Sequence, residues 1–576
     1  MSFSSQDLIE TDVLVVGGGL AGCWAALRAA ELVPNVVLAD KAVVARSGDA
    51  VFCHDILAPM PEDKLDIWLR EVVEHSEYLS DQRFVEIVLQ EEGARIADMV
   101  KWGVPFERDE AGDLFLSLGR GHKSSRVVLC DCRKLMEIMR REVLARGVRL
   151  AERVMVTELL TSDGQNPTCG RIAGALGIDT RSGKVVVFKA KAVVLCTGVI
   201  SLKLHTCFAD NLTGDAQAMA FRAGAELGAL EFVSGGIKFT CVHNGQLIVS
   251  SLMPFQTQGA QIVNKLGERF MESCLPERKE RGATFGLLMQ AATKELIEGR
   301  GPLFFDMRHF TPEHHQQMKR ILPLRTFPLY QAGLNPAKDL IPCQVLLTYF
   351  RGGVTMDIDG ESTIPGLLAG GVAAHFLGWS EGLSGSMLAL CNVFGYRAGE
   401  RAAKIVGEAG PVKIDQGQVE RLKDVLLAPA KRGKGLAPMD IYHRLNKTLI
   451  QPEFCLFRSE SGVSNALGEI RRCMAEDMPR VFARDAHELI KANEARNFLE
   501  VLVPTSIAAL ERKESRLSHY RVEYPYRDDK EWLKWVMVRK DNGGIKVRFQ
   551  PVPVESNRIK PPSRERIPAP VQLSRR

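Results

Sequence analysis

A glycine-rich turn near the start of the chain constrains the fold more than any other feature. A short apolar run precedes the sequence Gly-Gly-Gly-Leu-Ala-Gly at 17–22, and a run rich in alanine and leucine follows it. Gly17 permits a tight bend, Gly19 lets backbone N–H groups approach a pyrophosphate, and Gly22 lets the helix pack closely on the strand. The pattern predicts a strand, a turn and a helix whose positive N-terminus binds a dinucleotide.

An acidic residue ends the second strand of the same unit. Residues 36–39 are apolar and lead to Asp40, eighteen positions after Gly22. A carboxylate at this spacing can accept the hydroxyl protons of a ribose. An ordinary glycine loop is the alternative, but it does not explain the strand, the helix and the acid together. We therefore expect a Rossmann-like α/β domain.

Two later segments favour a flavin over a nicotinamide cofactor. Residues 41–48, Lys-Ala-Val-Val-Ala-Arg-Ser-Gly, follow the acid directly. Residues 189–198 have the pattern of a buried strand that ends in a small Thr197-Gly198 turn. Together the two segments indicate an FAD enzyme.

The bulk properties limit the class of protein. A chain of 576 residues exceeds the usual limit of about 250 to 300 residues for one core, so two or three packed units are expected. No apolar run reaches the ~20 residues of a membrane helix, and the N-terminus has no signal-peptide pattern. These observations predict a cytoplasmic protein.

Charge and cysteine usage argue against two further classes. The formal net charge is +5, and residues 558–576 account for all of it, which argues against a nucleic-acid surface. The thirteen cysteines include no Cys-x-x-Cys, and the closest pair is Cys130 and Cys132. Iron–sulfur clusters and structural zinc usually need clustered thiolates, so no metal site is expected within this chain.

Further segments carry a family resemblance that spans nearly the whole chain. They are residues 119–126, 213–232, 352–357, 365–371 and 512–528. With the nucleotide motifs they resemble the succinate dehydrogenase/fumarate reductase flavoprotein superfamily, which also includes L-aspartate oxidase. Within it, the alpha subunit of adenylylsulfate reductase looks most similar, on the strength of residues 11–13, 41–48, 512–516 and 531–534.

The resemblance implies a domain order. An FAD-binding domain in two pieces is expected at 1–237 and 345–408, with an α+β capping domain at 238–344 between them. A helical domain at 409–530 follows, and a hairpin with a basic disordered tail completes the chain at 531–576. The residues support the last part, because alternating runs flank Asp541-Asn542-Gly543-Gly544. From Val552 onward the chain is rich in proline and arginine without periodicity, which predicts disorder.

FAD is expected to bind noncovalently. Members of the family that tether the flavin place a histidine directly after the serine that corresponds to Ser47, whereas this chain has Gly48. Val372 stands where the family has an acid for the ribityl chain, which predicts weaker FAD binding. The expected cofactor contacts are Gly17, Gly18, Gly19, Gly22, Asp40, Lys41, Ser47, Gly48, Thr197, Gly198, Asp215 and Ser386.

Catalytic candidates are the cations that could stabilise negative charge beside a flavin, namely Lys238, Arg351, Arg126 and His122. The alternatives are a surface basic loop for Arg126 and His122 and a solvated lysine for Lys238. By resemblance, Lys238 corresponds to a substrate-site arginine of adenylylsulfate reductase.

The chain also departs from the family at its substrate site. Phe285 and Gly286 stand where an arginine and an aspartate handle the transferred proton in fumarate reductases. Ser380 stands where adenylylsulfate reductase has a histidine.

The leading hypothesis is an FAD-dependent oxidoreductase subunit that exchanges electrons between a small anionic substrate and a ferredoxin-like iron–sulfur subunit. Two alternatives are open. One is a fumarate reductase-like enzyme that acts on a carbon–carbon bond, and the other is a non-catalytic flavin electron carrier or scaffold.

Overall fold

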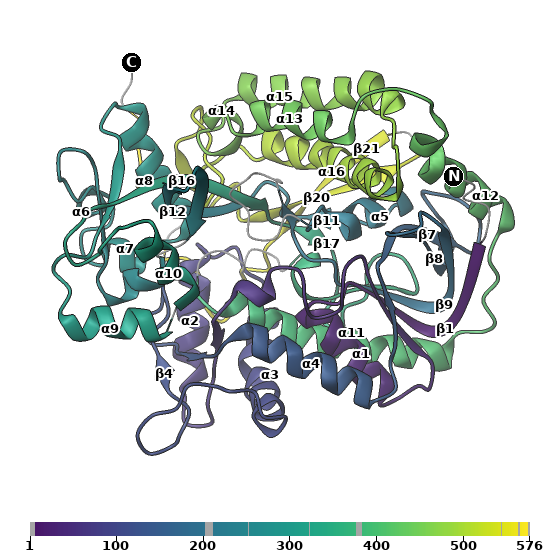
Figure 1. The fold of residues 1–576 in the computed structure, drawn as a ribbon, viewed down its shortest axis with the longest axis horizontal. Coiled ribbons are helices and arrows are strands. Elements are labelled where there is room, and N and C mark those ends of the chain that lie inside the picture. The colour runs from purple at the N-terminus through teal and green to yellow at the C-terminus, as the bar shows by residue number, and fades with distance from the viewer. Residues whose placement is uncertain are drawn as a thin grey trace.

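The computed structural model describes residues 6–201, 211–250, 253–321, 323–375, 383–542, 544–562 and 565–573. Helices and strands alternate in its N-terminal part, and long helices dominate the region before the C-terminal strands (Figure 1). The expected α/β class with a helical C-terminal region is confirmed.

A mostly parallel sheet forms the centre of the N-terminal part. Its order is β6-β2-β1-β9-β8-β7, and β18 pairs with β9. β1, β2, β6, β9 and β18 are parallel where they pair, whereas β8 and β7 continue the sheet in antiparallel fashion. The bounds are β1 Gln6–Val16, β2 Val36–Asp40, β6 Arg149–Glu152, β7 Val154–Thr161, β8 Ile172–Asp179, β9 Val185–Leu195 and β18 Leu367–Ala369.

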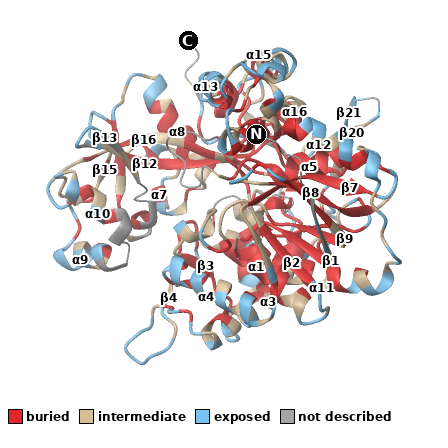
Figure 2. Ribbon diagram, turned by 45° about the vertical axis from the view of Figure 1, so that its right-hand side comes forward, coloured by how far each residue is buried: buried red, intermediate tan, exposed pale blue. Residues whose placement is uncertain are grey.

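Helices bury one face of this sheet. α1 and α11 pack against each other, and α3 and α4 lie beside them at the bottom of Figure 1. The sheet and these helices are buried where they meet (Figure 2), which explains why residues 13–16 of β1 and 36–39 of β2 are apolar. The bounds are α1 Leu20–Ala30, α3 Gln82–Lys101, α4 Cys132–Ala145 and α11 Ser386–Glu408.

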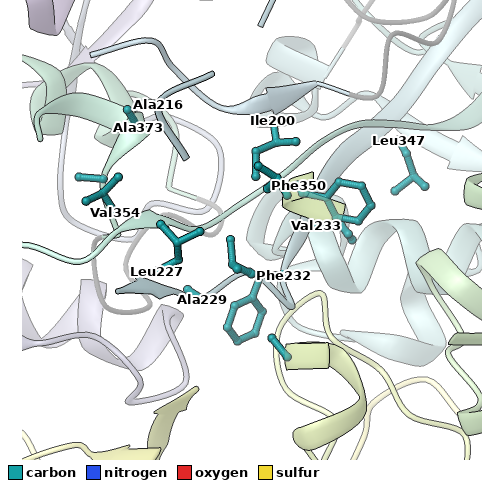
Figure 3. Packing of buried hydrophobic residues seen from close by; sticks show 14 of the residues in the cluster. Ile200, Ala216, Leu227, Ala229, Phe232, Val233, Leu347, Phe350, Val354 and Ala373 are labelled. Carbon is teal, nitrogen blue, oxygen red and sulfur yellow. The ribbon is translucent and has the colours of Figure 1, made fainter. Parts of the chain in front are cut away.

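A second sheet is built mainly from the region expected to be inserted between the two pieces of the FAD-binding domain. Its order is β13-β12-β16-β15-β14, with β10 paired to β16, and α8 packs on β12. The bounds are β10 Ile200–Ser201, β12 Val233–His243, β13 Gln246–Ser250, β14 Gln261–Val263, β15 Leu303–Asp306, β16 Ile341–Phe350 and α8 Phe285–Ile297. Figure 3 shows the apolar junction between this sheet and the rest of the molecule, where Ile200, Val233 and Phe350 lie near Leu227 and Val354.

The structure also contains several short helices and strands. They are β3 Asp55–Leu57, α2 Leu65–His75, β4 Leu116–Ser117, β5 Val127–Leu129, α5 Asp215–Ala223, β11 Leu227–Gly228 and β17 Gly353–Val354. β3, β5 and β4 form a small sheet of their own. The domain boundaries expected from the resemblance stay predictions.

The helical region and the hairpin complete the molecule. α15 packs on α16, and β20 pairs with β21 in the hairpin that the alternating sequence predicted. The hairpin joins β11 and β17 in one sheet. The bounds are α12 Gln416–Lys431, α13 Pro438–Leu449, α15 Glu460–Arg472, α16 Ala486–Glu511, β20 Lys534–Asp541 and β21 Gly544–Pro551.

The disorder predicted from Val552 onward is wrong for the described part of that segment. β22, Arg566–Pro568, pairs with β19, Tyr526–Asp528, and Ile559 and Val571 are buried. Apolar residues scattered between prolines therefore pack on a surface that the rest of the folded chain provides. None of the helices built from the described residues combines the length and apolar character needed to cross a bilayer.

Candidate functional site

A cavity lies at the carboxyl ends of β1, β2 and β9, where dinucleotides bind in open α/β sheets. The amino-terminal turn of α11 forms its far wall. Its lining includes Val16, Gly17, Gly19, Asp40, Lys41, Ser47, Gly48, Cys53, Met155, Thr197, Gly198, Leu212, Asp215, Val372, Met387 and Leu388. Most of the expected cofactor contacts therefore line one space.

The glycine turn has the geometry that its sequence predicted. Gly17 has a φ of +106°, and a Cβ there would lie 2.4 Å from Cys196 O. A Cβ on Gly22 would lie 1.8 Å from Gly17 O, so the helix can approach the turn only without one. At Gly19 a Cβ would meet nothing within 4 Å, although this residue lines the cavity. The open space at the start of α1 suits a pyrophosphate.

Asp40 fixes the turn and keeps acceptor capacity. Its carboxylate accepts hydrogen bonds from Gly18 N at 2.7 Å and from Ala42 N at 2.6 Å. A carboxylate has about four lone-pair sites, so it can also accept ribose hydroxyls. Burial raises the pKa of Asp40, and the two backbone N–H groups oppose this shift. Gly18 thus holds the acid and does not itself line the cavity.

Lys41 is held by a buried acidic pair. Its Nζ donates to Asp215 at 2.8 Å, to Glu494 of α16 at 3.0 Å and to Thr213 at 2.8 Å. Burial would lower the pKa of Lys41, but the two carboxylates raise it above its usual value. Asp215 also accepts from Asn497 Nδ2 at 2.9 Å. Lys41 therefore positions the wall of the cavity and stays charged.

The Thr-Gly turn after β9 is bonded to the start of α5. Thr197 Oγ1 accepts from Ala216 N at 2.9 Å, and Gly198 O accepts from Gln217 Nε2 at 2.9 Å. Both turn residues line the cavity, as do Ser47 and Gly48 on the opposite side.

The start of α11 faces the cavity, but not through Ser386. The hydroxyl of Ser386 donates to Leu383 O at 2.7 Å, and the side chain is completely buried. Met387, Leu388 and Cys391 line the cavity instead. The expected contact is thus corrected: Ser386 shapes the turn, and its helix supplies the neighbouring surface.

Arg351 lies at this end of the cavity. Its guanidinium donates to Ser234 Oγ at 3.1 Å and contacts Met387 Sδ at 3.3 Å, and the residue is 3% exposed. Among the described residues no carboxylate forms an ion pair with it. Tyr349 packs against Val199 and Leu212, as Val372 and Met387 do, and burial raises the pKa of its hydroxyl to about 12. The structure therefore places this predicted cation against Met387, which lines the cavity, although Arg351 itself is not part of the lining.

The other three catalytic candidates lie elsewhere. Lys238 of β12 is buried and donates to Thr348 Oγ1 at 3.3 Å, on the strand that leads to Arg351. His122 is buried, and its Nε2 donates to Ser384 O at 2.8 Å, just before α11. Burial lowers the pKa of His122. Arg126 is a correction, because it forms a partly exposed ion pair with Asp63 at 2.7 Å, away from the cavity.

Arg120 lies near Phe285, which stands where the family resemblance places a proton donor. Phe285 begins α8, and the guanidinium carbon of Arg120 lies 3.7 Å from the centre of its ring. Arg120 Nη1 donates to Ala283 O at 2.8 Å, and Arg120 O accepts from Ser384 N at 3.0 Å. The Gly119–Arg126 loop thus connects the capping segment with the start of α11. Ser380, the other substituted position, lies outside the described residues.

Sequence reasoning missed Glu494 and Asn497, which reach the cavity wall from α16. No local motif marks them, because they lie on a long helix more than 270 positions from Lys41 and Asp215. The same is true of Tyr349 at the other end. Only the folded chain brings these residues together.

The residues present fit FAD. An open glycine turn at a helix N-terminus suits a pyrophosphate, Asp40 can accept ribose hydroxyls, and Met387 of the lining contacts the buried cation Arg351. At that end Val372 offers no carboxylate, so the ribityl region has fewer polar contacts.

Two family models match the chain. The FAD binding domain model matches residues 12–388, and the fumarate reductase flavoprotein C-terminal model matches residues 443–566. One relative, from the fumarate reductase (CoM/CoB) of Methanothermobacter marburgensis, is 26% identical over 93% of this chain and 98% of its own length. The cofactor is therefore FAD.

Solved structures show the same fold. A quinol fumarate reductase flavoprotein from E. coli is 22% identical and has a TM-score of 0.86, with 97% of this chain and 99% of that chain covered. Adenylylsulfate reductase from Archaeoglobus fulgidus is 21% identical and has a TM-score of 0.79, with 95% and 96% covered. The comparison of folds thus does not favour adenylylsulfate reductase over fumarate reductase as the more similar protein. The chain belongs to the family of FAD-dependent oxidoreductase flavoproteins that includes the fumarate reductase and succinate dehydrogenase flavoprotein subunits.

Proposed function

We propose that this chain is the cytoplasmic flavoprotein subunit of an oxidoreductase that exchanges electrons between a small anionic substrate and an iron–sulfur partner. When bound, FAD supplies a two-electron carrier that can also pass electrons singly. The chain supplies the groups that hold the flavin and a cation that can bind the substrate.

Arg351 carries this proposal. A guanidinium that is 3% exposed and has no carboxylate partner among the described residues is costly to bury. An anion at the flavin end of the cavity would neutralise it through bidentate hydrogen bonds. Arg351 also contacts Met387, which lines the cavity, so that anion would lie beside the flavin.

We propose that the flavin is bound without a covalent link. Gly48 lines the cavity next to Ser47, and it has no side chain to bond to the flavin. Acid precipitation of the purified protein is expected to release all of the yellow chromophore into the supernatant. Flavin that stays with the pellet would contradict this part of the proposal.

The activity is tested by anaerobic reoxidation of the reduced, FAD-loaded protein. Fumarate, other unsaturated acids and adenylylsulfate are each mixed with it, and flavin absorbance is followed. At least one anion is expected to reoxidise the flavin faster than buffer does. Arg351→Gln is expected to lower kcat/KM for that anion by about 100-fold or more.

Arg308→Gln is the matched control, because Arg308 is half exposed and pairs with Asp306 at the surface. It is expected to leave kcat/KM unchanged. If no anion reoxidises the flavin, or if Arg351→Gln behaves like the control, the catalytic proposal fails and the electron carrier is favoured.

The second candidate is reduction of a carbon–carbon double bond. The name of the Methanothermobacter relative supports it, since that protein is a fumarate reductase subunit. Phe285 and Gly286 argue against the family's proton donor at its usual place. Reoxidation by unsaturated acids alone would favour this candidate, and reoxidation by adenylylsulfate alone would favour the sulfur reaction.

A further inference from the structure

A second cavity, of about 570 Å³, lies against Gly121 and Lys123 of the Gly119–Arg126 loop. Among the described residues, none lines both cavities. The second is enclosed by the end of α2, the capping segment before and within α8, the loop around Leu517 and the C-terminal segment at Ala569. The site proposed for the substrate does not use any of these residues.

Arg278 contributes a cation to this cavity. It is half-buried, and its Nη2 donates to the carbonyl oxygens of Gly121 at 3.2 Å and His122 at 2.7 Å. No carboxylate of the described residues forms an ion pair with it. Burial lowers the pKa of Arg278, which remains far above neutrality as for any arginine. The cavity therefore has a guanidinium whose charge is not balanced by an ion pair.

His75 contributes a second polar group. Its Nε2 is buried and has no hydrogen-bond partner among the described residues, and His75 lines the cavity. Burial lowers the pKa of His75 to about 3, and the cations Arg120, Arg278 and Lys123 add to the shift. The imidazole is therefore neutral at pH 7. A neutral imidazole can donate one hydrogen bond to an anion.

Most acids of the cavity already have partners. Glu71 accepts from the backbone N–H groups of Lys123, Ser124 and Ser125. Glu74 pairs with Lys123 at 3.5 Å. The remaining acid near Arg278, Glu277, is exposed, so solvent screens its charge. Glu77 also lines the cavity; it accepts from Leu517 N at 3.3 Å, and burial raises its pKa. Among the described lysines and arginines of the lining, Arg278 is the one without an ion pair, since Lys123 and Arg516 pair with carboxylates.

Apolar side chains form much of the remaining wall. They are Leu275, Pro276, Leu287, Leu517, Ala569 and Pro570. Together they would cover an organic body, whereas an inorganic anion would leave this surface uncovered. Pockets of this size take ligands larger than a small inorganic ion.

We propose that the second cavity binds an organic carboxylate, whose carboxylate group is held by Arg278 and His75 and whose apolar body lies against Leu275, Leu287 and the C-terminal segment. The site is separate from the flavin cavity, so binding there does not depend on the proposed function. The carboxylate accepts charge-assisted hydrogen bonds from Arg278 and one further bond from His75. The tail of the chain, expected to be disordered, forms one wall of this site.

Calorimetric titration of the FAD-loaded protein tests the proposal. The probes are butyrate, hexanoate, octanoate and 3-phenylpropionate, with inorganic sulfate as an anion that has no apolar body. Affinity is expected to rise along the series from butyrate to octanoate, because each added CH₂ is buried against the wall. Arg278→Gln is expected to weaken binding by about tenfold or more.

Lys279→Gln is the matched control, since Lys279 adjoins Arg278 but pairs with Glu272 at the surface. It removes the same charge and is expected to leave affinity unchanged. If Arg278→Gln does not fold, His75→Phe decides, because it keeps the ring and removes the hydrogen bond. No heat from any carboxylate, binding of sulfate alone, or equal affinity in the deciding variant and the control would overturn the proposal.

Discussion

Gly19 shows at the scale of one residue how the absence of a side chain makes room for a ligand. Its backbone is extended, with φ −76° and ψ −170°, a conformation that alanine can adopt. A methyl group there would touch nothing of the protein within 4 Å, because it would extend into the flavin cavity. Gly17 differs, because its φ of +106° and the nearby Cys196 O require glycine for folding itself.

Gly19→Ala is therefore expected to fold normally and to bind FAD more weakly, by about tenfold or more, since the methyl group occupies space needed by the pyrophosphate. Flavin fluorescence titration of the apoprotein measures the affinity, and thermal unfolding checks the fold. Gly468→Ala is the control, because Gly468 lies in α15 with open space around it. Equal FAD affinity in the two variants would sink the assignment of this turn to the pyrophosphate.

At the scale of elements, three helices beneath the sheet are joined by one chain of buried polar groups. Trp24 of α1 donates to Asn392 Oδ1 at 2.8 Å, and Asn392 of α11 donates to Glu92 Oε1 at 2.6 Å. Glu92 of α3 is 0% exposed, and its second oxygen has no hydrogen-bond partner among the described residues. Burial raises the pKa of Glu92 well above its usual value, so the folded protein binds a proton there that the unfolded chain releases.

The sign of the pH dependence follows from this raised pKa. Protonated Glu92 makes its full contribution to the free energy of unfolding below about pH 4.5, the pKa of this group in the unfolded chain. The contribution is lost as the pH rises through the higher pKa of Glu92 in the folded protein. Glu92→Gln keeps the acceptor for Asn392 and needs no proton. It is expected to raise the unfolding temperature at pH 8 by about 2 °C and to have less effect near pH 5. Calorimetry at both pH values measures this, and a gain that grows toward acidic pH would contradict a raised pKa.

At the scale of the whole molecule, the sequence predicted the features that depend on patterns of neighbouring residues. The turn at 17–22 and the acid at Asp40 act within about 30 residues, so the Rossmann-like unit could be named in advance, and most of the expected cofactor contacts line one cavity. The partners of Lys41 could not, because Glu494 lies 453 positions away in the chain. The loop that holds Arg126 suggested a place at the site, and its partner Asp63 became visible only in the folded chain. Charge in a motif does not say which way a side chain turns.

The C-terminal segment joins parts that are far apart in sequence. Gln82, at the start of α3, hydrogen-bonds to both the N–H and the C=O of Ile559, and β22 pairs with β19. Val571 is 1% exposed. Sequence composition predicted disorder here because single apolar residues between prolines show no period, yet Ile559 and Val571 are buried on a surface that the rest of the chain provides.

Truncation after Pro551 is therefore expected to lower the unfolding temperature by ~5 °C or more, because it exposes the apolar surface under Ile559 and Val571. Differential scanning fluorimetry measures the shift, and limited trypsin digestion of the full chain is expected to cleave slowly at Arg558 and Arg566. The variant Arg558→Gln separates charge from burial, since Arg558 forms exposed ion pairs with Asp66 and Glu86 that contribute little. Its unfolding temperature is expected to stay close to that of the full chain. Rapid cleavage of the segment, together with a truncated protein as stable as the full chain, would support the prediction of a disordered tail. It would also contradict the role of this segment as one wall of the second cavity.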